Sequence, residues 1–149
     1  IQTIPFKADG TAVAGGTAPV FGRVVRTAGD ITTTSTTLVD VTGATVTFTT
    51  GAFPCNVGCA MSILNNSADT TENNSFNIAV DGALELGTTG IRVSPGAVSI
   101  SKNGSFSHQT AALTAASHTI KMQWRVSAGT GTIEAGSVIA FSFWANEIR

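Results

Sequence analysis

The segment from His118 to Gly129, HTIKMQWRVSAG, decides the fold class. Its even-numbered positions are apolar (Ile120, Met122, Trp124 and Val126), and its odd-numbered positions are polar (Thr119, Lys121, Gln123 and Arg125). Successive side chains of a β-strand point to opposite sides. The alternation therefore predicts a strand with one face in a core and the other in water.

The same period recurs along the chain between short turn segments. In ATVTFTT, residues 44–50, Val46 and Phe48 alternate with threonines. FNIAVDG, residues 76–82, ends in Asp81–Gly82, a strong signal for a tight hairpin. No segment carries a sustained apolar stripe with the 3.6-residue period of a helix. About nine or ten short strands, spaced by roughly 8–12 residues, predict an all-β domain built as an antiparallel β-sandwich or barrel.

The composition of the chain narrows the classes of partner that it could bind. The chain has 149 residues and a mass of 15.1 kDa, which suits one domain. Its net charge of −1 provides no basic field for nucleic acid or acidic lipid, and no apolar run approaches the roughly 18 residues of a membrane span. Only 11% of its residues are charged, against about 25% in typical soluble domains. We therefore expect hydroxyl and amide groups, and protein partners, to cover its surface.

Residues 1–22 have no period of either kind and are interrupted repeatedly by proline and glycine. Such a segment is either a frayed terminus or an extended arm lying on another surface. The arm is favoured because its apolar residues would otherwise be exposed: Ile1, Ile4, Pro5, Phe6, Val13, Val20 and Phe21. We therefore expect an arm over 1–22 and a β-sandwich over 23–149. Because Ile1 is not an initiator methionine, we also expect a processed or trimmed chain.

The last segment, SVIAFSFWANEIR at 137–149, is apolar on both faces of its expected strand. Such a strand is buried on both sides, here either under a loop or against another subunit. We favour a subunit interface. Its predicted members are His118, Lys121, Arg125, Val138, Trp144 and Ile148. His118 has the parity of a core or interface position, whereas the two cations suit either the rim of a contact or a solvated face.

The chain offers little for catalysis. Neither a Gly-x-Ser-x-Gly nucleophile motif nor a glycine-rich phosphate loop before a helix is present. Its isolated Glu85 and Glu134 do not indicate a paired-carboxylate site. We expect no enzyme activity, no catalytic residues and no cofactor.

Two sets of residues could in principle bind a metal. Cys55 and Cys59 suit two reduced, buried thiols, with a local disulfide or a metal site as the alternatives. Asp69, Glu72 and Asp81 could hold calcium, but their spacing matches no known calcium loop, and a solvated loop is favoured. We expect no metal.

Two stretches carry a family resemblance. TSTTLVDV at 34–41 and HTIKMQWR at 118–125 resemble motifs in the jelly-roll modules of tailed-bacteriophage structural proteins. The resemblance extends from about Gly29 to Arg149. It implies a jelly-roll-like sandwich and trimers on virion surfaces, as head decoration (cement) proteins or as fibre head domains. It supplies no catalytic residues.

The short, weakly charged arm favours a capsid decoration or cement protein on the outer surface of the capsid. As a homotrimer, it would clamp neighbouring major capsid proteins through arm residues Ile1, Ile4, Pro5, Phe6, Val13, Val20 and Phe21. One alternative is a receptor-binding or glycan-binding fibre head, for which Trp144 and the asparagine-rich run at 65–75 are the candidate sugar contacts. A weaker alternative is a secreted monomeric enzyme or carbohydrate-binding accessory domain.

Overall fold

A computed structural model of the chain describes residues 20–67, 73–94, 100–136 and 140–149. These ranges contain eleven strands and no helix, which confirms the all-β prediction. The strands are β1 (Phe21–Arg26), β2 (Ile31–Thr33), β3 (Val39–Thr49), β4 (Cys55–Asn65), β5 (Asn74–Val80), β6 (Ala83–Leu84), β7 (Ile91–Val93), β8 (Lys102–Gln109), β9 (Ser117–Val126), β10 (Gly131–Glu134) and β11 (Phe141–Glu147). Accordingly, no helix in these ranges is long and apolar enough to span a membrane.

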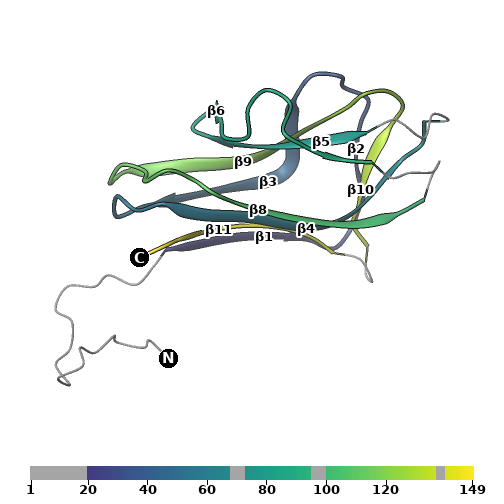
Figure 1. The fold of residues 1–149 in the computed structure, drawn as a ribbon. Helices are drawn as coiled ribbons and strands as arrows, with labels where there is room; N and C mark the ends of the chain where they lie inside the picture. Colours follow the sequence, from purple (N-terminus) through teal and green to yellow (C-terminus); the bar gives the residue numbers. More distant parts are fainter. Residues whose placement is uncertain (1–19, 68–72, 95–99, 137–139) are drawn as a thin grey trace.

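The strands form two sheets, stacked face to face (Figure 1). In the first sheet, β4 pairs with β8 along one edge. Along its other edge it pairs first with β11 and then with β10, while β1 lies outside β11 and β2 outside β10. In the second sheet, β9 lies between β3 and β5, and the far edge of β5 carries β7 and β6 in turn. All these pairings are antiparallel.

The order of pairing identifies the sandwich as a jelly roll. Strand β1 pairs with β11, β3 with β9, β4 with β8 and β5 with β7. The outermost strands of the chain thus pair with each other, and the inner ones follow in nested order. A long hairpin folded over on itself produces this arrangement, which is the double Greek key of a jelly roll. The predicted jelly-roll-like sandwich is therefore confirmed.

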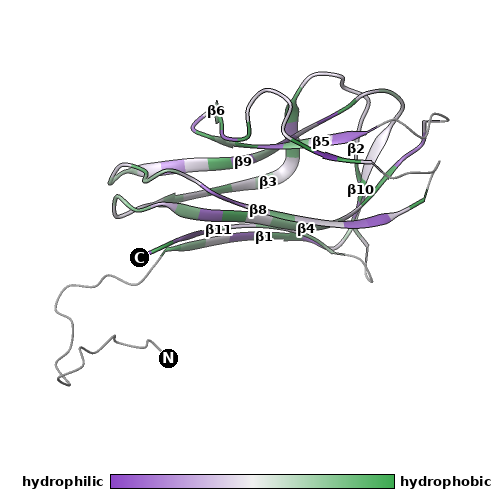
Figure 2. Cartoon of the chain, in the orientation of Figure 1, coloured by the Kyte–Doolittle hydropathy of each residue, from purple (hydrophilic) through white to green (hydrophobic). Residues whose placement is uncertain are grey.

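The core lies between the two sheets and follows the alternation seen in the sequence. Along β9, Ile120, Met122 and Trp124 are buried, while the intervening side chains face outward. Figure 2 shows this change between hydrophobic and hydrophilic bands along β9. Trp124 stacks on Phe76 of β5 with ring centroids 6.1 Å apart. From the first sheet, β4 and β11 contribute the opposing core side chains, including Phe143.

Two local features shape the second sheet around β5. Asp81 and Gly82 both have positive φ, of 50° and 89°, as the tight turn between β5 and β6 requires, so the predicted hairpin is confirmed. The segment after this hairpin then folds over the outer side of β5. There the Asn77 amide donates to the Gly87 carbonyl, and its oxygen accepts from the Leu86 N–H. All seven residues of β5 are buried as a result.

The sandwich begins slightly earlier than expected. Phe21 and Gly22, assigned above to the arm, belong to β1 and pair with Asn146 and Ala145 of β11. A Cβ atom at Gly22 would lie 3.1 Å from that of Val46, so this part of β1 packs closely on β3. Arm residues Ile1, Ile4, Pro5, Phe6 and Val13 lie outside the described ranges.

Candidate functional site

The six residues predicted for one subunit interface lie in different places. Lys121 and Arg125 extend from β9 on the outer side of the second sheet, whereas Trp144 lies on β11 in the first sheet. The sandwich therefore separates these cations from the tryptophan. Ile148 is half-buried beyond β11, where its N–H donates to the Pro54 carbonyl at 2.8 Å. Val138 lies outside the described ranges.

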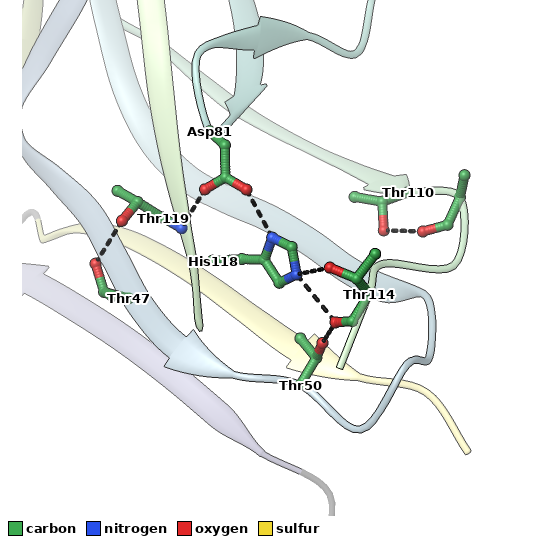
Figure 3. A network of polar contacts seen from close by, with 8 residues as sticks. Thr47, Thr50, Asp81, Thr110, Thr114, His118 and Thr119 are labelled. Carbon is green, nitrogen blue, oxygen red and sulfur yellow. Dashed lines mark hydrogen bonds and ion pairs between the residues drawn. The ribbon is translucent and has the colours of Figure 1, made fainter. Parts of the chain in front are cut away.

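His118 is a structural link inside the subunit (Figure 3). Its Nδ1 lies 2.6 Å from the Asp81 carboxylate, which also accepts from the Thr119 N–H at 2.8 Å. Its Nε2 lies 3.2 Å from the Thr114 hydroxyl and 3.0 Å from the Thr114 carbonyl. The side chain is only 9% exposed. His118 thus ties the β5–β6 turn to the segment before β9, and the sequence assignment to core or interface resolves in favour of the interior.

The order carboxylate, imidazole, hydroxyl resembles a hydrolase triad, but the protonation pattern differs. The hydrogen bond to Asp81, followed by the backbone hydrogen bond to Thr114, raises the pKa of His118. A carbonyl oxygen only accepts, so Nε2 carries a proton in this arrangement. Nδ1 likewise donates to Asp81, whose pKa is lowered by its hydrogen bonds from Thr119 and His118. An imidazole that donates at both nitrogens cannot take a proton from Thr114, so the geometry suits a clip and not a general base.

The outer face of the second sheet is polar, and Lys121 on it is paired with a carboxylate of the same chain. It carries Thr45, Thr47 and Thr49 on β3 beside Thr119, Lys121, Gln123 and Arg125 on β9, and we call it the threonine face. Asp40 accepts from the Lys121 ammonium at 2.6 Å and from the Gln123 amide at 2.8 Å. These hydrogen bonds lower the pKa of Asp40. Lys121 is therefore already paired within its own chain.

The outer face of the first sheet is composed very differently. Three rows of directly opposed residues cross β1, β11, β4 and β8. They are Phe21–Asn146–Asn56–Gln109, Arg23–Trp144–Gly58–Ser107 and Val25–Ser142–Ala60–Ser105. We call these twelve residues the small-residue face. Arg23 is their single charge. Six of the twelve are glycine, alanine, serine or valine, and the face is nearly neutral.

The apolar members of the small-residue face are exposed along one side. Phe21 is 60% and Val25 49% exposed, both on β1, the strand at the edge of the sheet. At the opposite side, Ala60, Ser105 and Ala140 line an open hollow. Large exposed apolar side chains on an edge strand are a liability for a monomer, and proteins usually cover or interrupt them. This face is the best candidate for an assembly surface in the described chain.

The edge strand is anchored through Glu147. The backbone N–H of Glu147 donates to the Val20 carbonyl at 2.9 Å, immediately before β1. Its carboxylate is fully buried and accepts from the Arg149 guanidinium at 2.8 Å and from the Gly51 N–H. Burial alone would raise the pKa of Glu147, but the hydrogen bonds from Gly51 and Arg149 lower it below its usual range. The start of β1 is thus fixed to the end of β11.

Both cysteines are free and buried, which confirms the favoured prediction for them. Burial raises the pKa of Cys59 to about 12, and that of Cys55 is also raised. Of the residues considered for calcium, Asp69 and Glu72 lie outside the described ranges, and Asp81 is held by His118. Within those ranges, no three His, Cys, Asp or Glu side chains are grouped as a metal site would require.

Comparison with known proteins supports the fold. No protein-family model matches the chain, and no curated protein matches it in sequence. Among solved structures, it is similar to a chain of T=1 particles derived from infectious bursal virus. That match has a TM-score of 0.52 and 12% identity over 99% of this chain and 40% of the viral one.

Two further structures match at lower scores. One is the VP2 subviral particle of infectious bursal disease virus, with a TM-score of 0.48 and 11% identity over 99% of this chain and 41% of that one. The other is dimeric latent PorU from Porphyromonas gingivalis, with a TM-score of 0.44 and 11% identity over 97% of this chain and 14% of that one. The chain spans well under half the length of these three proteins. At such identities the likeness concerns the fold alone.

Proposed function

We propose that the protein is a virion structural component: a homotrimeric decoration, or cement, protein on the outer surface of a tailed-phage capsid. The observation that carries this proposal is the small-residue face, with its exposed Phe21 and Val25 and its single charge, Arg23. The similarity of its jelly roll to a viral particle chain supports the setting. The protein acts by binding and not by catalysis.

The size of the face suits a subunit contact. Four strands spaced by about 4.8 Å, each contributing roughly six residues at about 3.3 Å, give a projected area near 400 Å². The accessible surface of such a patch is of the same order as the roughly 800 Å² that each partner contributes to a standard interface. Small side chains let another backbone approach closely, and a nearly neutral surface loses little solvation when it is covered.

A cyclic trimer needs a heterologous contact, in which two different surfaces of each subunit meet. We propose that β1 of one subunit, with Phe21 and Val25, lies against the small side chains around Ala60 on the next subunit. Repeating this contact closes a ring of three. Residues 1–19 then extend from the trimer to the major capsid protein, and three linked arms increase the avidity of attachment without any single strong contact.

Sedimentation equilibrium tests the assembly. The wild-type chain should sediment at three times 15.1 kDa. Ala60→Arg places a bulky charge in the proposed contact and should give a monomer. Thr47→Arg, an equivalent change on the threonine face, should leave the trimer intact. A wild-type monomer, or a trimer unaffected by Ala60→Arg, would refute this interface.

Quantitative mass spectrometry of purified particles tests the role. A copy number in the hundreds, in simple ratio to the major capsid protein, is expected for decoration. Removal of residues 1–19 should abolish particle binding and leave the trimer intact, because β1 begins at Phe21. A few copies per particle would favour the fibre-head alternative, and absence from particles would refute the virion role.

A further inference from the structure

On the outer side of the second sheet, next to the threonine face, lies a pocket of about 240 Å³ where β7, β5 and β9 lie side by side. Its lining includes Arg92 and Arg125, together with Thr36, Asn73, Ser75 and Ser127. Val126 is the one apolar residue of the lining, and the pocket faces away from the small-residue face, across the sandwich. It is somewhat smaller than the roughly 300–1,000 Å³ of sites for drug-sized ligands, so it suits a small polar group.

The strand register brings the two arginines together. Ser75 on β5 lies directly opposite Arg92 on β7 and directly opposite Arg125 on β9. Directly opposed residues point to the same side of a sheet, and each strand step is about 4.8 Å. The two arginines therefore flank one serine from both sides, and both line the pocket. Ser75 is only 5% exposed, as expected for a short side chain between two long ones.

Neither arginine has a carboxylate partner in the described ranges. The carboxylates there are engaged elsewhere: Asp30 with the Ala135 N–H, Asp40 with Lys121, Asp81 with His118, Glu85 with His108, Glu134 with Ser62 and Glu147 with Arg149. Arg125 makes one long hydrogen bond, of 3.5 Å, to the Thr36 carbonyl. Arg92 is exposed and makes no ion pair with any described residue. The pocket thus carries two positive charges that the described chain does not neutralise.

The remaining lining groups suit hydroxyl recognition. Ser127 Oγ accepts from the Asn73 N–H at 2.8 Å, which orients one side of the pocket. Serine and threonine hydroxyls donate and accept, and an asparagine amide does both with separate atoms. Guanidinium groups bind planar carboxylates through paired hydrogen bonds. The combination of two arginines with several hydroxyl and amide groups therefore matches a ligand that carries both an anion and neighbouring hydroxyls.

We propose that this pocket binds a carboxylated saccharide, with the carboxylate between Arg92 and Arg125 and the sugar hydroxyls against Ser75 and the Asn73–Ser127 side. The site lies at the end of the asparagine-rich run singled out in the sequence, but it does not use Trp144, which lies on the opposite sheet. A ligand at this position leaves the small-residue face free, so the inference does not depend on the proposed trimer.

Titration of the full-length protein, followed by amide chemical shifts, tests the site. Sialyllactose is the probe, lactose is the neutral control, and sodium acetate and sodium sulfate are simple-anion controls. Sialyllactose should shift the resonances of Ser75 and Arg125 with millimolar affinity, lactose should not, and the simple anions should bind at least ten-fold more weakly. Arg92→Ala and Arg125→Ala should each weaken sialyllactose binding at least ten-fold. Lys102→Ala, which removes an exposed charge from β8, should leave it unchanged.

Each contrary outcome is specific. Equal binding of lactose and sialyllactose would overturn the role of the carboxylate. Equal binding of acetate or sulfate would reduce the pocket to a simple anion site and overturn the saccharide assignment. No response to sialyllactose, or binding that survives both arginine substitutions, would overturn the site itself. None of these results changes the sedimentation of the protein, so a failure here is distinguishable from failure of the assembly proposal.

Discussion

The Trp144 indole can lie across β4 only because Gly58 beneath it has no side chain. This contact yields a quantitative prediction. A Cβ atom added at Gly58 would lie 2.6 Å from Cζ2 and 2.8 Å from Cε2 of the Trp144 indole. It would also lie 3.1 Å from the Phe106 carbonyl oxygen on β8. Contacts this short force the indole to move, because the backbone on the other side cannot yield easily.

Gly58→Ala should therefore destabilise the fold by about 1–3 kcal/mol, the usual cost of overpacking. For a chain of this size that corresponds to a fall in Tm of roughly 3–10 °C. Urea unfolding at a fixed chain concentration measures the change in free energy. Tryptophan fluorescence should shift to the red in the native state as the Trp144 indole enters water, while Trp124 stays buried.

Gly104→Ala is the matched control. Gly104 lies on the neighbouring strand β8, and a Cβ atom there would meet only the Met61 side chain, at 3.8 Å. This substitution should change stability by less than about 0.5 kcal/mol. A double-mutant cycle then isolates the contact: Gly58→Ala should cost less in a Trp144→Ala background, with a coupling of about 1 kcal/mol or more. Equal effects of the two glycine substitutions, or an additive cycle, would refute the reasoning.

Three further predictions concern buried groups. Because the pKa of His118 is raised, its bond to Asp81 stabilises the fold fully below pH 6.5, the ordinary pKa of histidine, and less as pH rises through the raised value. The difference in urea midpoint between the wild type and His118→Gln should therefore shrink from pH 6 to pH 8. A constant difference would contradict this assignment. Cys55 and Cys59 should resist a thiol reagent in the native protein and react, both of them, only after unfolding in guanidinium; rapid labelling of the native protein would argue against their burial. Glu147→Gln should cost about 1–3 kcal/mol at pH 7 in urea unfolding, because it weakens buried charge-assisted hydrogen bonds. Since the pKa of Glu147 is lowered, that difference should disappear as pH falls through the lowered value, and a difference that persists in acid would point to packing instead.

The period-two pattern was sufficient to predict the strands but not their partners. The alternation in 118–129 correctly gave a strand with Trp124 in the core, and Asp81–Gly82 correctly gave a hairpin, because both signals are local. Pairing of β1 with β11 joins segments from the two ends of the described chain and leaves no mark within a short window. The strand order was therefore not predicted; the family resemblance implied only a jelly-roll-like sandwich, which the structure confirms.

The candidate surfaces were harder to predict for a related reason. Alternation shows which side chains of a strand face outward, but not to which sheet the strand belongs. Lys121 and Trp144 were therefore assigned to one interface, although the whole sandwich lies between them. Arg92 was not proposed as a binding residue, because the sequence does not show which strands lie beside its own. The available signal was an outward arginine with no acidic neighbour in sequence. It indicates a binding site only once the strand register places Arg92 and Arg125 on either side of Ser75.

The nested pairing also constrains how the protein is made. Val20 and Glu147, which are joined through their backbones, are 127 positions apart. During synthesis, β1 leaves the ribosome among the first strands, yet its partner β11 is the last of the eleven. One edge of β4 likewise has no partner strand until β10 and β11 have been synthesised. Proteins dominated by such distant contacts fold slowly, and their unpaired edges are exposed meanwhile. The nascent chain should therefore depend on chaperones until β11 has emerged, and ribosome-bound chains halted before residue 141 should remain sensitive to protease.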